Sequence, residues 1–332
     1  MTALSKSSLT FPVDANVNQP SDAESSKPRG LEPVSLKTAA LALLTVALWG
    51  ANPAAVSYSL DTLPPIAVAG LRFAMATVFM LFWCHVEGCG LRLRAGQRAP
   101  ALIAGLLLFL QIATFNVGVT LSNSSHSSMM INTFVLWVVV IEHFITKADR
   151  LTIRKLIGLF VAFGGVLLLL LRTDTVPSST SRDQPTLIGD AILLCSACIL
   201  AWKVIYIRHA LKVVEPGKLI FWHDLVGVVC FVICSASFET LEFGGFTTPA
   251  VISLIYQGVF VAGICFALQA LLLRHHSASQ IAIFSFATPL FGVGTGILLR
   301  GDQMTPMLVV AAICVAIGIL LINLKKPIAI SD

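Results

Sequence analysis

Long apolar runs recur along the chain, and a short segment rich in polar residues, glycine or proline separates each run from the next. Most runs are about 20 residues long, which is the length that an α-helix needs to cross the hydrocarbon core of a bilayer. A bilayer offers the backbone no water to bind, so such runs must be helices. The pattern predicts spans at residues 38–60, 66–84, 100–121, 125–145, 153–171, 187–210, 218–238, 250–273, 277–299 and 305–324.

The composition agrees with an all-α polytopic membrane protein. Hydrophobic residues make up 56% of the 332 residues, charged residues only 12%, and the mean hydropathy is +0.87. Soluble globular proteins carry about twice that share of charged residues. The composition excludes disordered, nucleic-acid-binding and disulfide-rich secreted classes, so we expect the lipid bilayer and no nucleic acid as a partner.

The distribution of basic residues predicts the orientation. Seventeen Lys and Arg residues fall on one side of the predicted spans and three on the other. Positive charge in short loops favours the cytoplasm. We therefore expect a multi-pass protein of the plasma (inner) membrane with both termini cytoplasmic. Residues 1–37, rich in Ser and Pro, are predicted to be a disordered tail, and residues 325–332 a short second tail.

The chain also repeats itself. A shift of 153 residues aligns four pairs without a gap: Trp49 with Trp202, Asp149 with Asp302, Thr152 with Thr305, and Gly165 with Gly318. Each unit holds five predicted helices, and because five is odd the second unit must enter the membrane from the opposite face. The prediction is ten transmembrane helices in two inverted five-helix repeats, residues 38–171 and 187–324, an architecture typical of alternating-access carriers.

Motifs in both halves follow the same order. The first helix carries Trp-Gly-x-Asn at Trp49, the second helix an arginine at Arg72, and each unit closes with an acidic turn before a helix rich in small residues, KADRLT and RGDQMTP. In this order the sequence resembles the EamA-type members of the drug/metabolite transporter superfamily. The resemblance covers about residues 38–324 and implies two EamA-like repeats and transport of a small metabolite.

Four positions depart from the pattern of that family. Asp149 and Asp302 stand where members commonly have Glu, and Ser57 stands where many have Lys. The proline common in the fourth helix is kept in the second half as Pro289, whereas the first half has Leu136. Substrate rules are therefore not carried over from relatives.

Polar side chains within the predicted spans are the candidates for substrate binding, because burying them in lipid is costly. The candidates are Trp49, Asn52, Arg72, Gln111, Asn116, Asn132, Trp202 and Gln257. Each amide could instead form an interhelical hydrogen bond, and Arg72 could pair with backbone carbonyls rather than a substrate anion. As a set they favour a central cavity for a small neutral or zwitterionic solute, such as an amino acid.

The candidates for gating are Glu142, Lys203, Asp224 and Pro289. Lys203 could extend its side chain to the cytoplasmic interface or form an inner gate with Glu142 and Asp224, which could equally be solvated charges at helix ends. Pro289 in mid-helix releases a carbonyl and acts either as a hinge or in packing alone. No acidic residue falls at a predicted midplane, which argues against a central proton-carrying carboxylate.

These features predict a secondary transporter that exports a small organic metabolite by alternating access. No P-loop pattern is present, and neither a catalytic residue, a metal site nor a cofactor is expected. Two alternatives are an intramembrane enzyme, for which no H-E-x-x-H or nucleophile motif is found, and a passive membrane scaffold. Self-association as a homodimer is left open.

Overall fold

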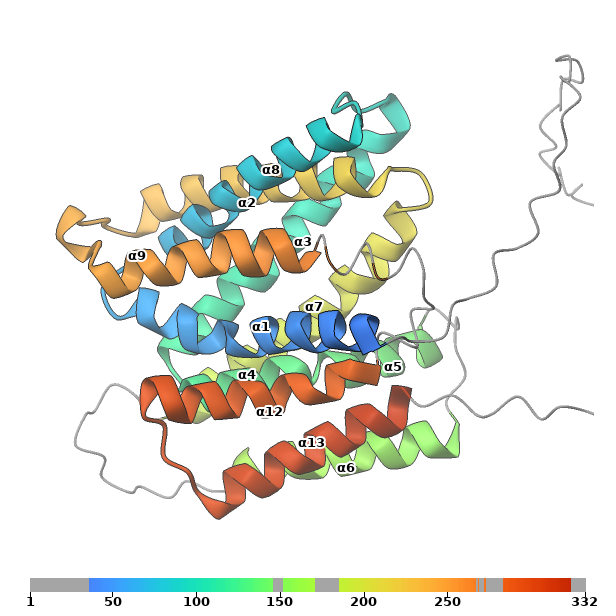
Figure 1. The fold of residues 1–332 in the computed structure, drawn as a ribbon, viewed down its shortest axis with the longest axis vertical. Helices are drawn as coiled ribbons and strands as arrows, with labels where there is room; N and C mark the ends of the chain where they lie inside the picture. The colour runs from blue at the N-terminus through green and yellow to red at the C-terminus, as the bar shows by residue number, and fades with distance from the viewer. Residues whose placement is uncertain are drawn as a thin grey trace, which may run out of the picture. The chain divides into compact units, whose positions relative to one another are not determined.

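The computed structural model describes residues 36–145, 152–170, 185–266, 268, 272 and 283–323 (Figure 1). Every regular element in these ranges is helical, which confirms the all-α class for this part of the chain. The two predicted tails lie outside the described residues, apart from Leu36 and Lys37, where the first helix begins. Asp149 of the first acidic turn also lies outside them.

Helices of the first half lie close to the predicted spans. They are α1 (Leu36–Leu60), α2 (Pro65–Glu87), α3 (Ala95–Thr120), the consecutive pair α4 (Ser124–Asn132) and α5 (Phe134–Phe144), and α6 (Ile153–Leu170). One predicted span, residues 125–145, is thus divided into two helices at Thr133.

The second half contains more irregular helix. It begins with α7 (Leu187–Ala210) and α8 (Pro216–Phe238), followed by the 3-10 turn η1 (Phe243–Gly245). Next, α9 (Thr248–Ile255) continues into the π-helix η2 (Tyr256–Ile264). A last composite segment consists of the 3-10 helix η3 (Ile283–Ala287), α12 (Thr288–Thr295) and the π-helix η4 (Gly296–Arg300), and α13 (Pro306–Asn323) follows it.

Six of the described helical segments are long and apolar enough to cross a membrane: α1, α2, α3, Ser124–Phe144, α7 and α8. The 25 residues of α1 extend about 37 Å at ~1.5 Å per residue, more than the ~30 Å hydrocarbon core. Thr248–Ile264 and Pro306–Ile322 are shorter apolar segments. Large apolar side chains point outward, including Leu298 at 83% exposure, and lipid rather than water suits such a surface.

Local chemistry sets several helix ends. Pro65 begins α2, where its fixed φ and missing N–H suit the first helical turn. Gly88 ends the same helix with φ +68°, a left-handed conformation that favours glycine. At the start of α7, Thr186 Oγ1 accepts a hydrogen bond from the backbone N–H of Gly189 at 3.0 Å.

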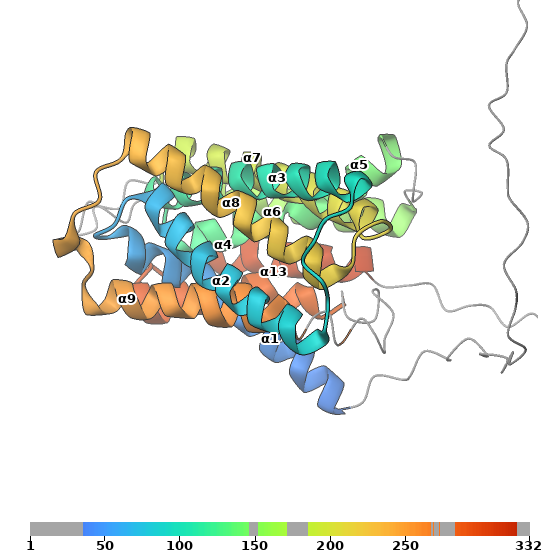
Figure 2. The same cartoon turned by 90° about the horizontal axis from the view of Figure 1, so that it is seen from above.

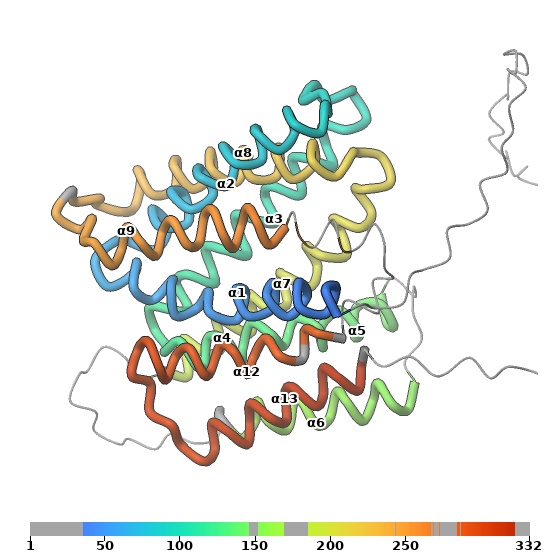
Figure 3. Tube along the Cα trace, viewed as in Figure 1, coloured from blue at the N-terminus to red at the C-terminus, as the bar shows by residue number. Residues whose placement is uncertain are grey.

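Helices from the two halves of the chain pack against one another throughout. The helix α2 packs on α8, α6 on α13, and α4 on α12, while α3 packs on both α7 and α8 and α1 on both α9 and α12 (Figures 1 and 2). The tube in Figure 3 shows α6 and α13 side by side. The largest buried cluster includes Phe115, Met129, Leu193 and Val315, so both halves contribute to the core.

Close backbone approach between α1 and α12 depends on glycine. A β-carbon added at Gly292 would lie 1.6 Å from Ser128 Oγ and 3.1 Å from the carbonyl oxygen of Gly50. One added at Gly50 would lie 2.8 Å from the carbonyl oxygen of Thr288. Neither position can accept a side chain without moving the neighbouring helix.

Loops of both halves meet at one end of the helices, on the left in Figure 1. We call this the α1–α2 end. Arg300 donates two hydrogen bonds to the carboxylate of Asp61, at 2.6 and 2.9 Å, and Thr62 Oγ1 donates to the carbonyl of Gly245 at 2.7 Å. The carboxylate of Glu239 accepts hydrogen bonds from the first backbone N–H groups of α2. These contacts join the two halves.

Candidate functional site

Four ionisable side chains are buried on α2, α7 and α8, three helices that all pack against α3. Arg72 is 6% exposed, Lys203 7%, and His223 and Asp224 2% each. Arg72 lies about 10 Å from the start of α2 and Asp224 about 12 Å from the opposite end of α8, at ~1.5 Å per residue. The charges of Arg72, Lys203 and Asp224 act on one another electrostatically. We call these four residues the buried charge cluster.

Arg72 is incompletely paired. Its Nε and Nη1 atoms are buried and have no hydrogen-bond partner among the described residues. The guanidinium carbon lies 5.1 Å from the centre of the Phe73 ring, and Phe73 stacks on Phe231 of α8. A cation–aromatic contact of this kind stabilises the charge without satisfying the N–H groups. Arg72 therefore keeps donors available inside the protein.

Lys203 is held by the amide of Gln111. Lys203 Nζ donates to Gln111 Oε1 at 2.8 Å, and Ser196 Oγ donates to the backbone carbonyl of Gln111 at 2.8 Å. The ammonium group therefore lies in the interior between α3 and α7. Of the two interpretations that the sequence leaves open, extension of the side chain to an interface does not fit this buried position, because Gln111 supplies an acceptor within the helix bundle.

His223 and Asp224 form a buried pair. His223 Nδ1 lies 2.8 Å from Asp224 Oδ1, and His223 Nε2 has no partner among the described residues. Both side chains are buried. Of the two interpretations of Asp224 from the sequence, a solvated charge at a helix end therefore does not apply. The position of Asp224 along α8 can be read from the sequence, but its burial depends on the helices that pack against α8.

The other predicted amides are distributed over several helices. Asn116 Nδ2 donates to the carbonyl of Pro65 at 2.8 Å, and Gln257 Nε2 to Ser59 Oγ at 2.8 Å, so both join helices near the α1–α2 end. Asn132 bonds within its own helix, to the carbonyl of Ser128. Acceptor oxygens remain unpaired on Asn52, Asn116 and Gln257 within the described part of the chain.

The two tryptophans matched by the internal repeat have different environments. Trp49 is half-buried on α1, with its ring 6.1 Å from that of Phe266 in an edge arrangement. Trp202 is 38% exposed on the surface of α7. The structure therefore does not bring Trp202 together with Trp49, although Lys203, the next residue, points inward.

The predicted gating residues are also separated. Glu142 accepts a hydrogen bond from the exposed Arg208 at 2.7 Å, rather than meeting Lys203 or Asp224. Pro289 lies in the first turn of α12, directly after the 3-10 helix η3, where its missing N–H leaves no helical bond broken. The change of helix type at this point marks a break in the span.

A second polar cluster, which sequence reasoning missed, lies at the α1–α2 end. Asp190 of α7 accepts a hydrogen bond from Ser122 Oγ at 2.7 Å and pairs with His126 Nδ1 at 2.9 Å. Asp302 Oδ2 accepts from the backbone N–H of Ser125 at 2.7 Å. The polar run SNSSHSS at residues 122–128 was the available indication, but it reads equally well as a loop between two spans.

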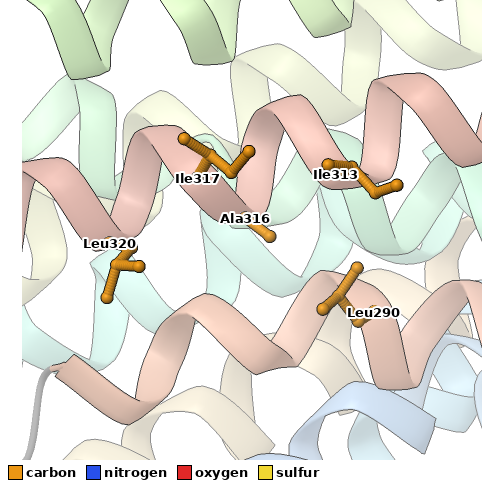
Figure 4. A pocket seen from close by; sticks show the side chains of 5 residues that line it. All are labelled: Leu290, Ile313, Ala316, Ile317 and Leu320. Carbon is orange, nitrogen blue, oxygen red and sulfur yellow. The ribbon is translucent and has the colours of Figure 1, made fainter.

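A pocket of about 160 Å³ lies between α12 and α13 (Figure 4). It is lined by Leu290, Ile313, Ala316, Ile317 and Leu320. With no polar group in its lining, it cannot orient a polar solute. No group of three or more His, Cys, Asp or Glu residues within the described ranges could hold a metal ion. The buried charge cluster is therefore the candidate site.

The sequence matches the EamA-like transporter family twice, over residues 36–171 and 187–324. It is 24% identical to the uncharacterized transporter YoaV of Bacillus subtilis (strain 168), over 84% of this chain and 94% of that protein. It is 22% identical to a protein of Escherichia coli (strain K12) named "Probable amino-acid metabolite efflux pump", over 86% and 94%. A crystal structure of another protein aligns with a TM-score of 0.63 at 16% identity, over 86% of this chain and 96% of that one, which indicates a shared fold.

Proposed function

Because the chain belongs to the EamA-like transporter family, it is a multi-pass membrane transporter of small metabolites and not an enzyme, and we propose that it works as a secondary carrier by alternating access. In this proposal ten crossings form two inverted five-helix repeats. Residues 38–171 and 187–324 are the repeats, and the two rock around a shared site.

Contacts between the two halves support the inverted repeat. Each helix of the first half has a counterpart in the second: α1 and α7, α2 and α8, α3 and α9–η2, α4–α5 and α12, and α6 and α13. If every helix is replaced by its counterpart, the principal contacts between the two halves are again contacts that the structure contains. The pairs α2–α8 and α6–α13 map onto themselves, the pair α3–α7 maps onto α1–α9, and α3–α8 maps onto α2–η2. A pseudo-twofold axis would give this pattern, and the site of such a carrier lies on the axis.

The observation that carries the proposal is the buried charge cluster, where α2 and α3 of the first half pack against α8 and α7 of the second. Intramembrane charges are costly and mark substrate pathways in membrane proteins. Unpaired donors on Arg72 and unpaired acceptors on Asn52 and Gln257 suit a zwitterionic or neutral organic solute. Two relatives whose names specify amino-acid metabolite efflux support export as the direction.

Counterflow in proteoliposomes tests the proposal. Vesicles holding the purified protein are loaded with unlabelled leucine, phenylalanine, threonine or lysine, and uptake of the same labelled amino acid is followed. Saturable exchange above protein-free vesicles, without ATP, is the expected result. If none of these amino acids, nor glucose or uridine in the same assay, exchanges through correctly folded protein, the proposed carrier function is wrong.

We also propose that both termini and Cys89 face the cytoplasm of the plasma membrane, from the distribution of Lys and Arg. In a variant whose other cysteines are replaced, Cys89 should react with a membrane-impermeant maleimide only after the cell membrane is opened. Cys89 lies in the connection between α2 and α3. Labelling of Cys89 from outside intact cells would invert the topology.

A further inference from the structure

We propose that Arg72 binds an anionic group of the transported solute, most simply a carboxylate, so that solutes without one are poor substrates. The inference rests on the proposed carrier function and narrows its substrate class from neutral or zwitterionic solutes to those that carry an anion. It concerns one buried side chain, Arg72, two of whose nitrogens have no hydrogen-bond partner among the described residues.

The hydrogen bonds within the buried charge cluster single out Arg72 as the residue that lacks a partner. Asp224, the acid of the cluster, is hydrogen-bonded to His223, and Lys203 is hydrogen-bonded to Gln111. Two basic side chains therefore face a single carboxylate, which is already hydrogen-bonded to His223. Arg72 keeps two buried nitrogens, Nε and Nη1, with no partner among the described residues. Within the described part of the chain, the Arg72 guanidinium is therefore the group of the cluster whose donors are left unpaired.

The surroundings of Arg72 leave the missing partner to a ligand. The π-helix η2 packs against α2 at this level: a β-carbon added at Gly258 would lie 3.0 Å from the carbonyl oxygen of Arg72, and the Arg72 charge also acts on Tyr256. Tyr256 itself donates its hydroxyl to the carbonyl of Leu48 at 2.6 Å, so it is a fixed neighbour rather than a counter-ion. π-Helical segments are rare and frequently occur at functional sites.

Physical chemistry favours a carboxylate as the missing partner. The guanidinium group presents planar, forked N–H donors that match a carboxylate, and hydrogen bonds between two charged groups are about twice as strong as neutral ones. A buried cation without a partner destabilises the empty protein, and an incoming anion removes that penalty. Such a carrier should bind a solute with a carboxylate more tightly than the corresponding amide. The difference in binding free energy is that of the charge-assisted hydrogen bonds that the amide cannot form.

The test compares each amino acid with its amide, which keeps the side chain and ammonium group but has no carboxylate. Ligand-induced shifts in melting temperature and exchange in proteoliposomes are measured for leucine, phenylalanine, threonine and lysine and for their amides, with glucose and uridine as uncharged solutes. The protein variants are Arg72→Gln, Arg72→Lys and, as a control, Arg98→Gln, which removes an exposed arginine at the start of α3.

The expected result has three parts. At least one amino acid stabilises the parent protein and is exchanged, while its amide is not. Arg72→Gln raises the dissociation constant about 10- to 100-fold and melts, without ligand, no lower than the parent, since it removes a buried charge whose donors are left unpaired. Arg72→Lys binds with intermediate affinity because it keeps the charge and loses the fork, and Arg98→Gln matches the parent.

Other outcomes overturn the inference in distinguishable ways. If amides or uncharged solutes bind and exchange as well as the acids, or if Arg72→Gln binds an acid with parental affinity, the anion site is wrong and the carrier stands. If Arg72→Gln fails to fold while Arg72→Lys keeps parental affinity, Arg72 has a structural role. If no solute binds or exchanges in the parent protein, the proposed function fails as well.

Discussion

The carboxylate of Glu239 is expected to hold the α1–α2 end closed. It follows the last residue of α8, and its two oxygens accept hydrogen bonds from the backbone N–H groups of Ile66 and Ala67 at 2.8 and 2.9 Å. These are free N–H groups in the first turn of α2, where a negative charge also interacts favourably with the helix dipole. Ser235 Oγ orients the carboxylate with a third hydrogen bond of 2.7 Å.

Glu239→Gln removes the charge and replaces one acceptor oxygen with a donor. One charge-assisted bond and part of the dipole interaction are lost, for a half-buried group about 1–2 kcal/mol. If opening this end requires α2 to separate from α8, the open population rises by about 5- to 30-fold. The free energy of global unfolding falls by no more than the same amount.

The assay is the reactivity of a buried cysteine. Ser57 is 8% exposed near the α1–α2 end, and its hydroxyl accepts a hydrogen bond from Ser124 at 3.2 Å. In a background free of the native cysteines, Ser57→Cys reacts with maleimide only when this end opens. Its labelling rate should therefore follow the open population.

The matched control is Glu242→Gln, an exposed acid in the same connection. We expect faster labelling with Glu239→Gln and an unchanged rate with Glu242→Gln. Equal rates in both variants, with the protein folded, would refute the role of Glu239 in closure.

Two further pairs of variants test the site and the packing. Trp49→Ala should reduce exchange more than it reduces folded protein, whereas Trp202→Ala, on the exposed face of α7, should transport at nearly the parental rate; equal losses would show that exposure does not separate their roles. Gly292→Ala should lower the melting temperature sharply because its β-carbon would overlap Ser128 of α4, while Gly294→Ala, with no atom within 4 Å, should not; equal stability would contradict the close packing of α4 on α12.

Depth in the membrane could be predicted from the sequence, but the direction of each side chain could not. Hydropathy places the ends of helices such as α1 and α7 within a few residues of those observed. Because helices in lipid are apolar on all sides, no amphipathic pattern indicates which face is buried. Trp202 and Lys203 are adjacent and at the same depth, yet one is exposed and the other buried. Only the packing of α3 on α7 distinguishes them.

Helix breaks were predictable in one half only. Pro289 indicates the break before α12, but the corresponding span of the first half has Leu136 in place of proline and is still divided, at Thr133. There the hydroxyl of Thr133 donates to the carbonyl of Met130 at 2.6 Å, which satisfies a backbone group at the break. Threonine also occurs within continuous helices, so it gives no indication of a break without the structure.

A double-mutant cycle tests whether the buried charge cluster is one electrostatic unit. Asp224→Asn leaves Arg72 and Lys203 as two buried cations with no acid beside them, and Lys203→Met removes one of those cations. No nitrogen of Lys203 lies within ion-pair distance of Asp224 in the described structure, so the coupling acts at longer range and should be about 1–3 kcal/mol. Each single variant should lower the free energy of unfolding.

The sign of the coupling decides the test. Each single variant loses the attraction between Asp224 and Lys203, but the double variant loses it only once, so the double variant should be more stable than the sum of the single effects predicts. Combining Asp224→Asn with Arg98→Gln, whose charge is exposed and distant in sequence, should give additive effects. Additivity within about 0.5 kcal/mol for Asp224 and Lys203 as well would mean that the two charges are independent. In that case Lys203 and Asp224 would not influence each other, and the attraction of an anion to Arg72 would have to come from the guanidinium group alone.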